Sequence, residues 1–379
     1  MENKKRTPRI ASIDMLRGFV MLIMLVDHVR EHFFTHHRVV DPMVIEETGS
    51  GLFFTRLLAH LCAPVFVFLT GLSVWLYSNP KDKPSRSATA FLLKRGLFLI
   101  LLEITLINFS WSASYNTLYL QVIWAIGICM ICLALLSKLP RIWIGVLGFI
   151  IVFGHNLLTP ITFDTTELGY NFWTILHDRG YLVTDSFIDI RVSYPLLPWV
   201  GVILLGYFTG PLYHHHMVAA RRQKILVFLG LSTLTLLLIL RGWNIYGETL
   251  PWETQNSVLK SVMSFLNYTK YPPSLHFLLF TLGIGFLLLS YFERINGRFS
   301  QVLKVYGAAP MFFYIIHLYV LLVFHAILIF TINKGEVIQV SHVYQLWLIS
   351  IIVSVLLYFP TKRFSNFKRL STSKLIKYF

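Results

Sequence analysis

Apolar stretches of about 20 residues alternate with short polar breaks along almost the whole chain, which is the length that a helix needs to cross a bilayer. Strands of an outer-membrane barrel would instead show alternation over segments of about ten residues. The pattern therefore predicts an all-α, polytopic integral membrane protein with ten transmembrane helices. We place these at roughly 12–34, 52–78, 90–110, 117–137, 141–159, 194–213, 224–242, 272–292, 305–331 and 343–360.

Composition agrees with this class. Hydrophobic residues make up 55% of the 379 residues and charged residues only 13%, and the mean hydropathy is +0.64. A soluble core could not hide so much apolar surface. We interpret 1–379 as a single transmembrane domain with a short cytoplasmic tail at 1–11 and a basic cytoplasmic tail at 361–379.

The basic residues predict the orientation. With a cytoplasmic N-terminus, 24 of the 33 Lys and Arg fall on the inner side, which predicts an even number of spans with both termini inside. The net charge of +15 is then mainly a topology signal and a poor argument for a nucleic-acid partner. The basic tail is expected to lie on anionic lipid through Lys362, Arg363, Lys368, Arg369, Lys374 and Lys377.

The first span carries ionisable side chains, which are costly in hydrocarbon and usually functional. The eleven steps from Arg17 to His28 amount to three helical turns plus about 20°, so both side chains lie on one face, about 16 Å apart along the axis. Asp14 shares that face, and Met21 and Met24 lie between. The spacing predicts a substrate track, although a snorkelling arginine and a packing histidine would also explain it.

Other polar groups in the spans are weaker candidates. Glu103 needs a partner at its depth, either Asn108 or a basic group from another helix, and both a functional and a structural role are open. His155, Asn156 and His317 could each line a binding site or sit in the bundle with satisfied hydrogen bonds.

Proline, cysteine and the polar loops complete the pattern. Pro64 should kink the second span. The three cysteines all fall within spans and indicate neither a disulfide framework nor a redox site. Outer loops at 160–193 and 243–271 are long enough to cap an acceptor site, or are solvated connections. The adjacent residues His214, His215 and His216 should point in different directions, so we predict no metal site.

Several of these segments together resemble a known family. They are residues 12–18 (SIDMLRG), 27–30 (DHVR), 62–71 (CAPVFVFLTG), 154–158 (GHNLL), 194–199 (YPLLPW) and 312–317 (FFYIIH). The chain resembles, over about residues 9 to 330, the bacterial relatives of heparan-α-glucosaminide N-acetyltransferase. That family is related to the acyltransferase-three enzymes, in which a basic residue, ten intervening positions and a histidine mark the acyl-transfer site. Arg17 and His28 reproduce this spacing.

The sequence also departs from the family. The lysosomal enzyme that the chain resembles has its proposed catalytic histidine later, in the loop after the first span, and an asparagine where this chain has His28. The corresponding loop here offers His32, His36 and His37, which we keep as the reserve assignment.

The resemblance implies an acetyltransferase of a bacterial inner membrane that uses acetyl-CoA as donor and needs no metal. Arg17, Lys94 and Arg95 would meet the phosphates of acetyl-CoA at the cytoplasmic face. His28, oriented by Asp27 or a neighbouring acid, would act as base or acyl relay, and Asp14 would orient Arg17. The acceptor, an amine or hydroxyl of a sugar or glycan, would arrive from the outer side. The residues predicted to bind it are Arg30, Glu103, His155, Asn156 and His317.

Two other classes of function remain open at this point. A proton-coupled transporter or flippase of a small solute or lipid-linked sugar would use the same buried charges, although no inverted repeat is visible. A non-catalytic scaffold would leave those charges without a purpose. The sequence also leaves open whether the protein forms a homodimer.

Overall fold

The computed structural model describes residues 10–34, 39–81, 83–331, 340–373, 376 and 378–379. Most of these residues are helical. The α-helices are α1 (Ala11–Phe33), α2 (Ser50–Ala59), α3 (Cys62–Ser78), α4 (Thr89–Leu102), α5 (Asn108–Ser112), α6 (Val122–Leu136), α7 (Arg141–Gly154), α8 (Tyr170–Leu176), α9 (Leu196–Phe208), α10 (Ala219–Gly242), α11 (Val258–Phe265), α12 (Leu275–Phe292), α13 (Arg298–Ala308), α14 (Pro310–Thr331) and α15 (Val343–Leu370). A π-helical turn, η1 (Glu103–Ile107), joins α4 to α5, and 3₁₀ turns η2 (His155–Leu158) and η3 (Gly210–Tyr213) extend α7 and α9.

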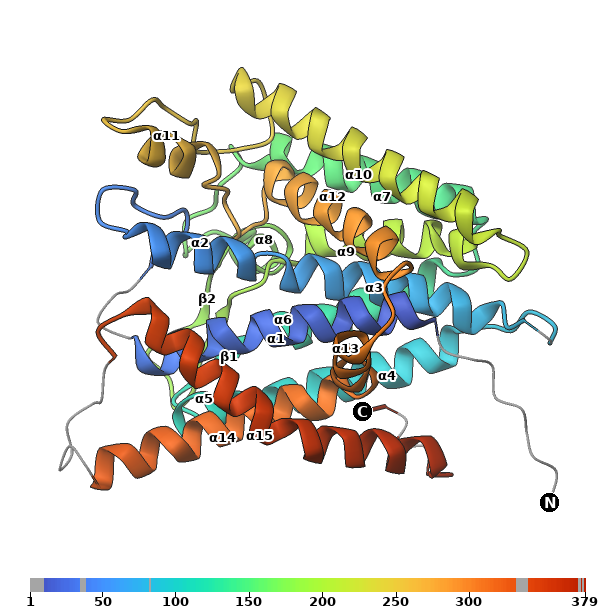
Figure 1. The fold of residues 1–379 in the computed structure, drawn as a ribbon. Coiled ribbons are helices and arrows are strands. Elements are labelled where there is room, and N and C mark those ends of the chain that lie inside the picture. The colour runs from blue at the N-terminus through green and yellow to red at the C-terminus, as the bar shows by residue number, and fades with distance from the viewer. Residues whose placement is uncertain (1–9, 35–38, 82, 332–339, 374–375, 377) are drawn as a thin grey trace.

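The long helices lie side by side as a bundle, and successive ones run in opposite directions (Figure 1). Among the described residues, six segments are long and apolar enough to cross a membrane: Ser50–Ser78, Arg141–Leu158, Ala219–Gly242, Leu275–Phe292, Pro310–Thr331 and Val343–Leu370. The protein is therefore a polytopic, mainly helical membrane protein, as the apolar pattern predicts.

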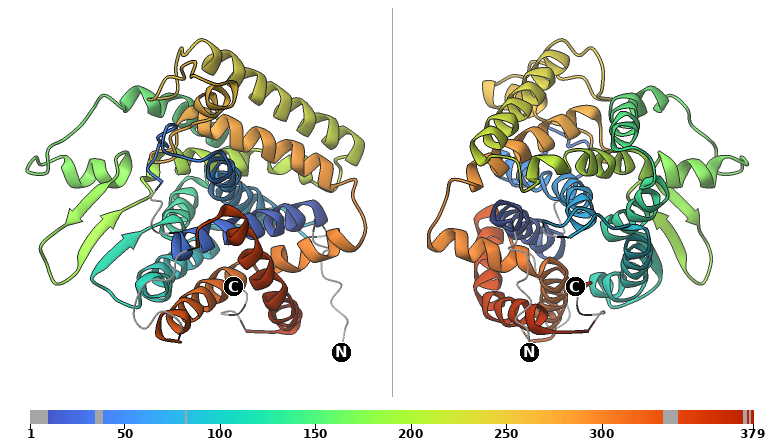
Figure 2. Two further views of the ribbon diagram at one scale, coloured as in Figure 1. Left: turned by 60° about the vertical axis from the view of Figure 1, so that its left-hand side comes forward. Right: turned by 90° about the vertical axis from the view of Figure 1, so that its right-hand side faces the viewer.

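The helical bundle carries a small sheet that the apolar pattern did not predict. A three-stranded sheet of order β1-β3-β2 forms from β1 (Thr117–Leu120), β2 (Gly180–Val183) and β3 (Asp189–Val192). β1 pairs parallel with β3, and β2 antiparallel with it. The sheet stands out from one side of the bundle (Figure 2). We call this end of the molecule, which also carries α8 and α11, the sheet end. The opposite end is called the mouth end, because a cavity opens there between exposed residues such as Lys81 and Arg86.

Three of the expected spans are divided or begin with a strand. Residues 117–120, the start of the fourth expected span, form β1. The expected span at 52–78 is broken between α2 and α3, and Pro64 lies in the first turn of α3, where a proline costs no helical hydrogen bond. The expected span at 305–331 is likewise two helices, α13 and α14.

α1 is the central helix of the bundle, in contact with α2, α3, α12, α13, α14 and α15. Its crossing with α13 is so close that a Cβ on Gly18 would lie 1.9 Å from the carbonyl oxygen of Leu303. A Cβ on Gly307 would lie 1.7 Å from the carbonyl oxygen of Asp14. Both positions need glycine because backbone meets backbone there.

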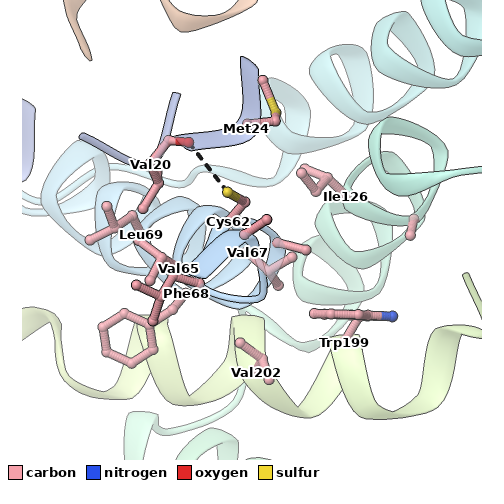
Figure 3. Close-up of a cluster of buried hydrophobic side chains, with 14 of the residues drawn as sticks. Val20, Met24, Cys62, Val65, Val67, Phe68, Leu69, Ile126, Trp199 and Val202 are labelled. Atoms are coloured by element: carbon pink, nitrogen blue, oxygen red, sulfur yellow. Dashed lines mark hydrogen bonds between the residues drawn. The ribbon is translucent and has the colours of Figure 1, made fainter. Parts of the chain in front are cut away.

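Buried side chains from α1, α3, α6 and α9 fill the space beside α1 (Figure 3). Cys62 is part of this core, where its thiol donates to the carbonyl oxygen of Val20 at 3.3 Å. Trp199 and Val202 of α9 are fully buried on the other side of α3. This packing fixes the face of α1 that is left to border the cavity described next.

Candidate functional site

A cavity of about 1470 Å³ runs beside α1, between α3, α4, α6, α13, α14 and α15. It is larger than the ~300–1000 Å³ of most small-molecule sites, so it can hold a long ligand. At the mouth end, exposed residues such as Lys81 and Arg86 line it. At the sheet end its lining includes the buried side chains of Lys270, Tyr194 and Tyr314, so this end is closed.

The stripe on α1 that the sequence predicts borders this cavity. Asp14, Arg17, Met21, Met24 and His28 all line it. The helical geometry places Arg17 near the mouth and His28 about 16 Å deeper. One cavity therefore joins Arg17 to His28, the two side chains that the helical spacing places on one face.

Asp14 and Arg17 form the ion pair that the sequence suggests. Nη1 of Arg17 lies 3.2 Å from Oδ1 of Asp14, one turn away on the same helix. Nη2 of Arg17 also donates to Oγ of Ser73 on α3. These contacts hold the guanidinium at the cavity wall.

The mouth is strongly cationic. The Lys and Arg that line it, besides Arg17, are Lys81, Arg86, Arg95, Lys304, Lys368 and Arg369. The carboxylate residues among the described lining residues are Asp14 and Asp27 alone. Of the two predicted donor-binding residues on α4, Arg95 lines the cavity, whereas Lys94 is exposed and lies outside the lining. Such a mouth attracts and retains a ligand with several phosphates.

The C-terminal segment contributes to this mouth, which the sequence did not indicate. α15 continues through Pro360 to Leu370, ten residues beyond the expected end of the last span. Lys368 and Arg369 therefore line the cavity, where we expected them to lie on lipid. Lys374 and Lys377 fall outside the described residues.

His28 is held by a second histidine. Its Nδ1 lies 2.6 Å from Nε2 of His317 on α14, and Nδ1 of His317 lies 2.7 Å from the carbonyl oxygen of Phe313. A carbonyl oxygen only accepts, so Nδ1 of His317 carries a hydrogen and, in a neutral ring, its Nε2 accepts from His28. Nε2 of His28 is then left with its lone pair, the form that a general base needs.

Aromatic rings enclose this pair. The His28 and His317 rings are nearly parallel, with 13° between their planes and centroids 4.9 Å apart, and Trp111 and Tyr314 meet His28 edge-on at 5.1 and 5.8 Å. Among the described residues, none makes a hydrogen bond to Nε2 of His28. The geometry thus leaves this nitrogen available to a ligand in the cavity.

Asp27 does not orient His28, contrary to our expectation. Its Oδ1 accepts from Nε of Arg30 at 2.9 Å, and Arg30 also donates to Glu31. An aspartate next in sequence to the histidine points about 100° away on a helix, which explains why another helix supplies the partner of His28. Arg30 is buried in this pair and lies outside the cavity lining.

Glu103 has a structural partner different from both that we predicted. Its Oε2 accepts from the backbone N–H groups of Ile123 and Trp124, both at 3.0 Å, at the start of α6. A carboxylate there satisfies N–H groups that a helix cannot pair internally. The side chain of Asn108 instead donates to the backbone carbonyl of Glu103. Neither Glu103 nor Asn108 lines the cavity.

His155 and Asn156 join two helices outside the cavity. Nε2 of His155 lies 2.8 Å from the carbonyl oxygen of Pro273, and Oδ1 of Asn156 accepts from the N–H of Leu275. They connect the end of α7 to the start of α12 and are absent from the cavity lining. The geometry gives them a positioning role within the fold.

The reserve histidines are placed less favourably than His28. His32 is buried, its Nδ1 lies 2.9 Å from the carbonyl oxygen of His28, and it is not among the lining residues. His36 and His37 lie outside the described residues.

Lys270 is a lining residue that the sequence analysis missed. It lies in the loop before α12, 6% exposed, and borders the closed end of the cavity with Asp27 and His28. A single lysine in a long polar loop gives no pattern from which burial could be predicted.

A clasp of two loops lies over the closed end. Oδ2 of Asp41 accepts from the backbone N–H groups of Lys270 and Tyr271, both at 2.9 Å. The side chain of Asn267 binds both the N–H and the carbonyl of Met43, at 3.1 and 2.7 Å. Nη2 of Arg56 lies 3.8 Å from Oδ1 of Asp41. We call these contacts the Asp41 clasp.

The three adjacent histidines converge, so the expectation that they point apart is wrong. Ligand atoms of His214, His215 and His216 lie within 4.8 Å of one another, as three metal ligands would. The turn after η3 is not a helix, which is why the helical argument fails. His214 and His215 border the cavity mouth.

Comparison with known families gives one match. The family model described as heparan-alpha-glucosaminide N-acetyltransferase, catalytic, matches residues 9–241, more than half of the chain. The match includes α1, Arg17 and His28 and ends before Lys270 and His317. Comparison with curated proteins gives no significant match.

Proposed function

Because the chain belongs to the heparan-α-glucosaminide N-acetyltransferase family, we propose that it transfers an acetyl group from acetyl-CoA to an amine or hydroxyl of a sugar or glycan. One observation carries the proposal beyond the family's general activity. A single cavity joins a cationic mouth to an imidazole nitrogen with a free lone pair, at the distance that a phosphate-bearing donor with a long arm would span.

The mouth suits the phosphates of acetyl-CoA. Exposed Lys81, Arg86 and Arg369 would attract them, and Arg17 and Arg95, deeper in the wall, would form charge-assisted hydrogen bonds. Met21 and Met24 offer a soft apolar surface to the pantetheine arm. The thioester would then lie beside His28.

At the closed end, His28 would act as general base. Its Nε2 takes a proton from the acceptor amine or hydroxyl while the acceptor N or O bonds to the carbonyl carbon of the thioester. The C–S bond breaks, the sulfur leaves with the electron pair, and the proton on Nε2 passes to it. The products are the acetylated acceptor and CoA with a free thiol. His317 would position His28 through the hydrogen bond at Nδ1.

We further propose that ten helical segments cross a bacterial inner membrane, with the mouth end in the cytoplasm. The reversal of direction between successive helices and the excess of Lys and Arg at the mouth end support this arrangement. The acceptor would then come from the side of the membrane on which the Asp41 clasp lies.

The orientation can be measured with single cysteines on the two ends. Leu168 is fully exposed at the sheet end and Ser85 is exposed at the mouth end, so Leu168→Cys and Ser85→Cys place one reactive thiol at each end. In a variant without the native cysteines, a membrane-impermeant maleimide should label Leu168→Cys in spheroplasts and Ser85→Cys only after permeabilisation. The reverse pattern would overturn the proposed sidedness.

Activity can be tested on purified protein with labelled acetyl-CoA and an amino sugar or glycan acceptor. We expect release of CoA thiol and label on the acceptor. His28→Ala should reduce kcat by roughly two to four orders of magnitude while acetyl-CoA still binds, because only the base is lost. The matched control is His32→Ala, one turn further along α1 and outside the cavity, which should keep most of the activity.

Two outcomes would change the proposal. Normal turnover by His28→Ala with loss in His32→Ala would move the chemistry to the last turn of α1, and loss in His36→Ala or His37→Ala would move it to the segment after α1. Uptake of a solute into proteoliposomes, without consumption of acetyl-CoA, would favour a transporter.

A further inference from the structure

Three buried cations gather at the closed end of the cavity, and they differ in what they face. Arg30 is paired with Asp27 and Glu31, and Arg56 lies 3.8 Å from Asp41. Neither lines the cavity. Lys270 does, which makes it the one cationic residue among the described lining residues at this end.

The backbone of Lys270 is held in place. Its N–H donates to Oδ2 of Asp41, and it forms a bridge with Pro273. The N–H of Ser274 donates to the carbonyl of Thr269, which closes the turn that contains Lys270. The turn fixes the direction in which the side chain leaves the backbone, and burial limits the space in which the flexible lysine stem can move.

The ammonium of Lys270 keeps its charge at this place. Nζ lies 5.1 Å from the ring centroid of Tyr271, and among the described residues no carboxylate lies within ion-pair distance of it. Burial favours the neutral amine, but Tyr271 and Asp27 outweigh this, so the pKa of Lys270 lies above its ordinary value. A buried cation without a close carboxylate can interact strongly with negative charge on a ligand.

We propose that Lys270 is a catalytic residue that stabilises the negative charge on the thioester oxygen during acetyl transfer. This inference rests on the function proposed above. When the acceptor bonds to the carbonyl carbon, the π electron pair moves onto the oxygen. Nζ of Lys270 donates a hydrogen bond to that oxygen until the carbonyl re-forms and the C–S bond breaks. His28 handles the proton and Lys270 the charge.

The test compares Lys270→Met with Lys270→Arg and a control. Methionine fills similar space without charge, so the fold should survive. We expect kcat for CoA release to fall about 100- to 1000-fold in Lys270→Met, as when one oxyanion donor is removed, with the Kd of acetyl-CoA within about threefold. Lys270→Arg should recover part of the activity. Lys260→Met, on α11 and outside the cavity, should behave like the unchanged protein.

The acceptor series separates this role from a binding role. Two acceptors are compared. Glucosamine carries no carboxylate, and a glucosamine disaccharide with a carboxylate is the anionic acceptor. Loss of kcat with both supports the proposal. A rise in KM with the anionic acceptor alone would overturn it in favour of an acceptor-binding lysine. Full activity of Lys270→Met beside an inactive His28→Ala would overturn the role of Lys270 and leave the proposed function standing. Full activity of both variants would contradict the placement of the chemistry at His28 and Lys270, whereas no CoA release by the unchanged protein would contradict the proposed function.

Discussion

The two ends of the cavity use charge in opposite ways. At the mouth, six Lys and Arg besides Arg17 stand at the wall, several of them exposed to solvent. At the closed end, the cations Arg30 and Arg56 are buried beside carboxylates, and of the described Lys and Arg there only Lys270 faces the cavity. Exposed charges act over distance and are screened by salt, whereas a buried charge acts on one atom nearby.

This difference separates capture of the donor from its chemistry. Substitutions at the mouth should change KM and its dependence on salt, because they weaken the attraction of phosphates. Substitutions at the closed end should change kcat, because they alter groups that interact with the reacting atoms. The connection between the two ends is the methionine track on α1.

The largest effect should come from blocking that connection. Met24→Trp places a large ring in the cavity between Arg17 and His28. We expect turnover to fall by roughly 100-fold or more, because misplacement of the thioester by about 1 Å can already cost 10²-fold. 3′,5′-ADP, which needs only the mouth, should still bind in calorimetry. Met24→Leu conserves volume and should keep near-normal activity; equal loss in both variants would show that the track is not a path for the arm.

A smaller effect should follow from releasing His28. His317→Ala removes the acceptor at Nδ1 of His28, so the ring loses its fixed tautomer and direction. We expect kcat to fall roughly 10- to 100-fold with little change in the KM for acetyl-CoA. His325→Ala, on the same helix but not hydrogen-bonded to His28, is the control in the same steady-state assay. An unchanged kcat in His317→Ala would mean that the histidine pair is structural.

At the mouth, a single charge should matter less. Arg86→Ala should raise the KM for acetyl-CoA roughly 3- to 10-fold at low salt, with kcat unchanged, and the difference should shrink at high salt. Lys94→Ala is the matched control, since Lys94 is basic and exposed yet lies outside the lining. A similar rise in KM in both variants would indicate a general effect of surface charge and would contradict binding of the donor phosphates at the mouth.

The Asp41 clasp should affect stability more than chemistry. Asp41→Ala leaves the N–H groups of Lys270 and Tyr271 without their acceptor, which should cost about 1–3 kcal/mol of unfolding free energy and lower Tm. Glu47→Ala, at an exposed position in the same loop, should leave the thermal melt unchanged. Equal melting temperatures for both variants would show that the Asp41 clasp does not contribute to the stability of the folded protein.

The sequence predicted those features that depend on a single helix. The apolar stretches located the long helices, and the 100° rotation per residue placed Arg17, Met24 and His28 on one face. The ion pair of Asp14 with Arg17 followed from the same geometry. The sheet was not predicted because three of the four residues of β1 are hydrophobic and continue into the apolar stretch of α6.

Contacts between distant segments could not be predicted in this way. His28 and His317 are separated by 289 positions, and no periodicity links them. Glu103 accepts hydrogen bonds from backbone N–H groups. Every residue except proline has such a group, so the sequence does not indicate which of them a carboxylate will bind. Lys270 lies in a loop held by the Asp41 clasp, a contact between residues 229 positions apart.

The most direct test of the account is a cryo-EM structure of the purified protein with acetyl-CoA. We predict that the phosphates lie among Arg86, Lys304 and Arg369, that the pantetheine arm passes Met21 and Met24, and that the thioester lies within hydrogen-bond reach of Nε2 of His28. An acetyl-CoA molecule bound elsewhere, or one whose thioester stays at the mouth far from His28, would contradict the claim that one cavity joins donor capture to chemistry.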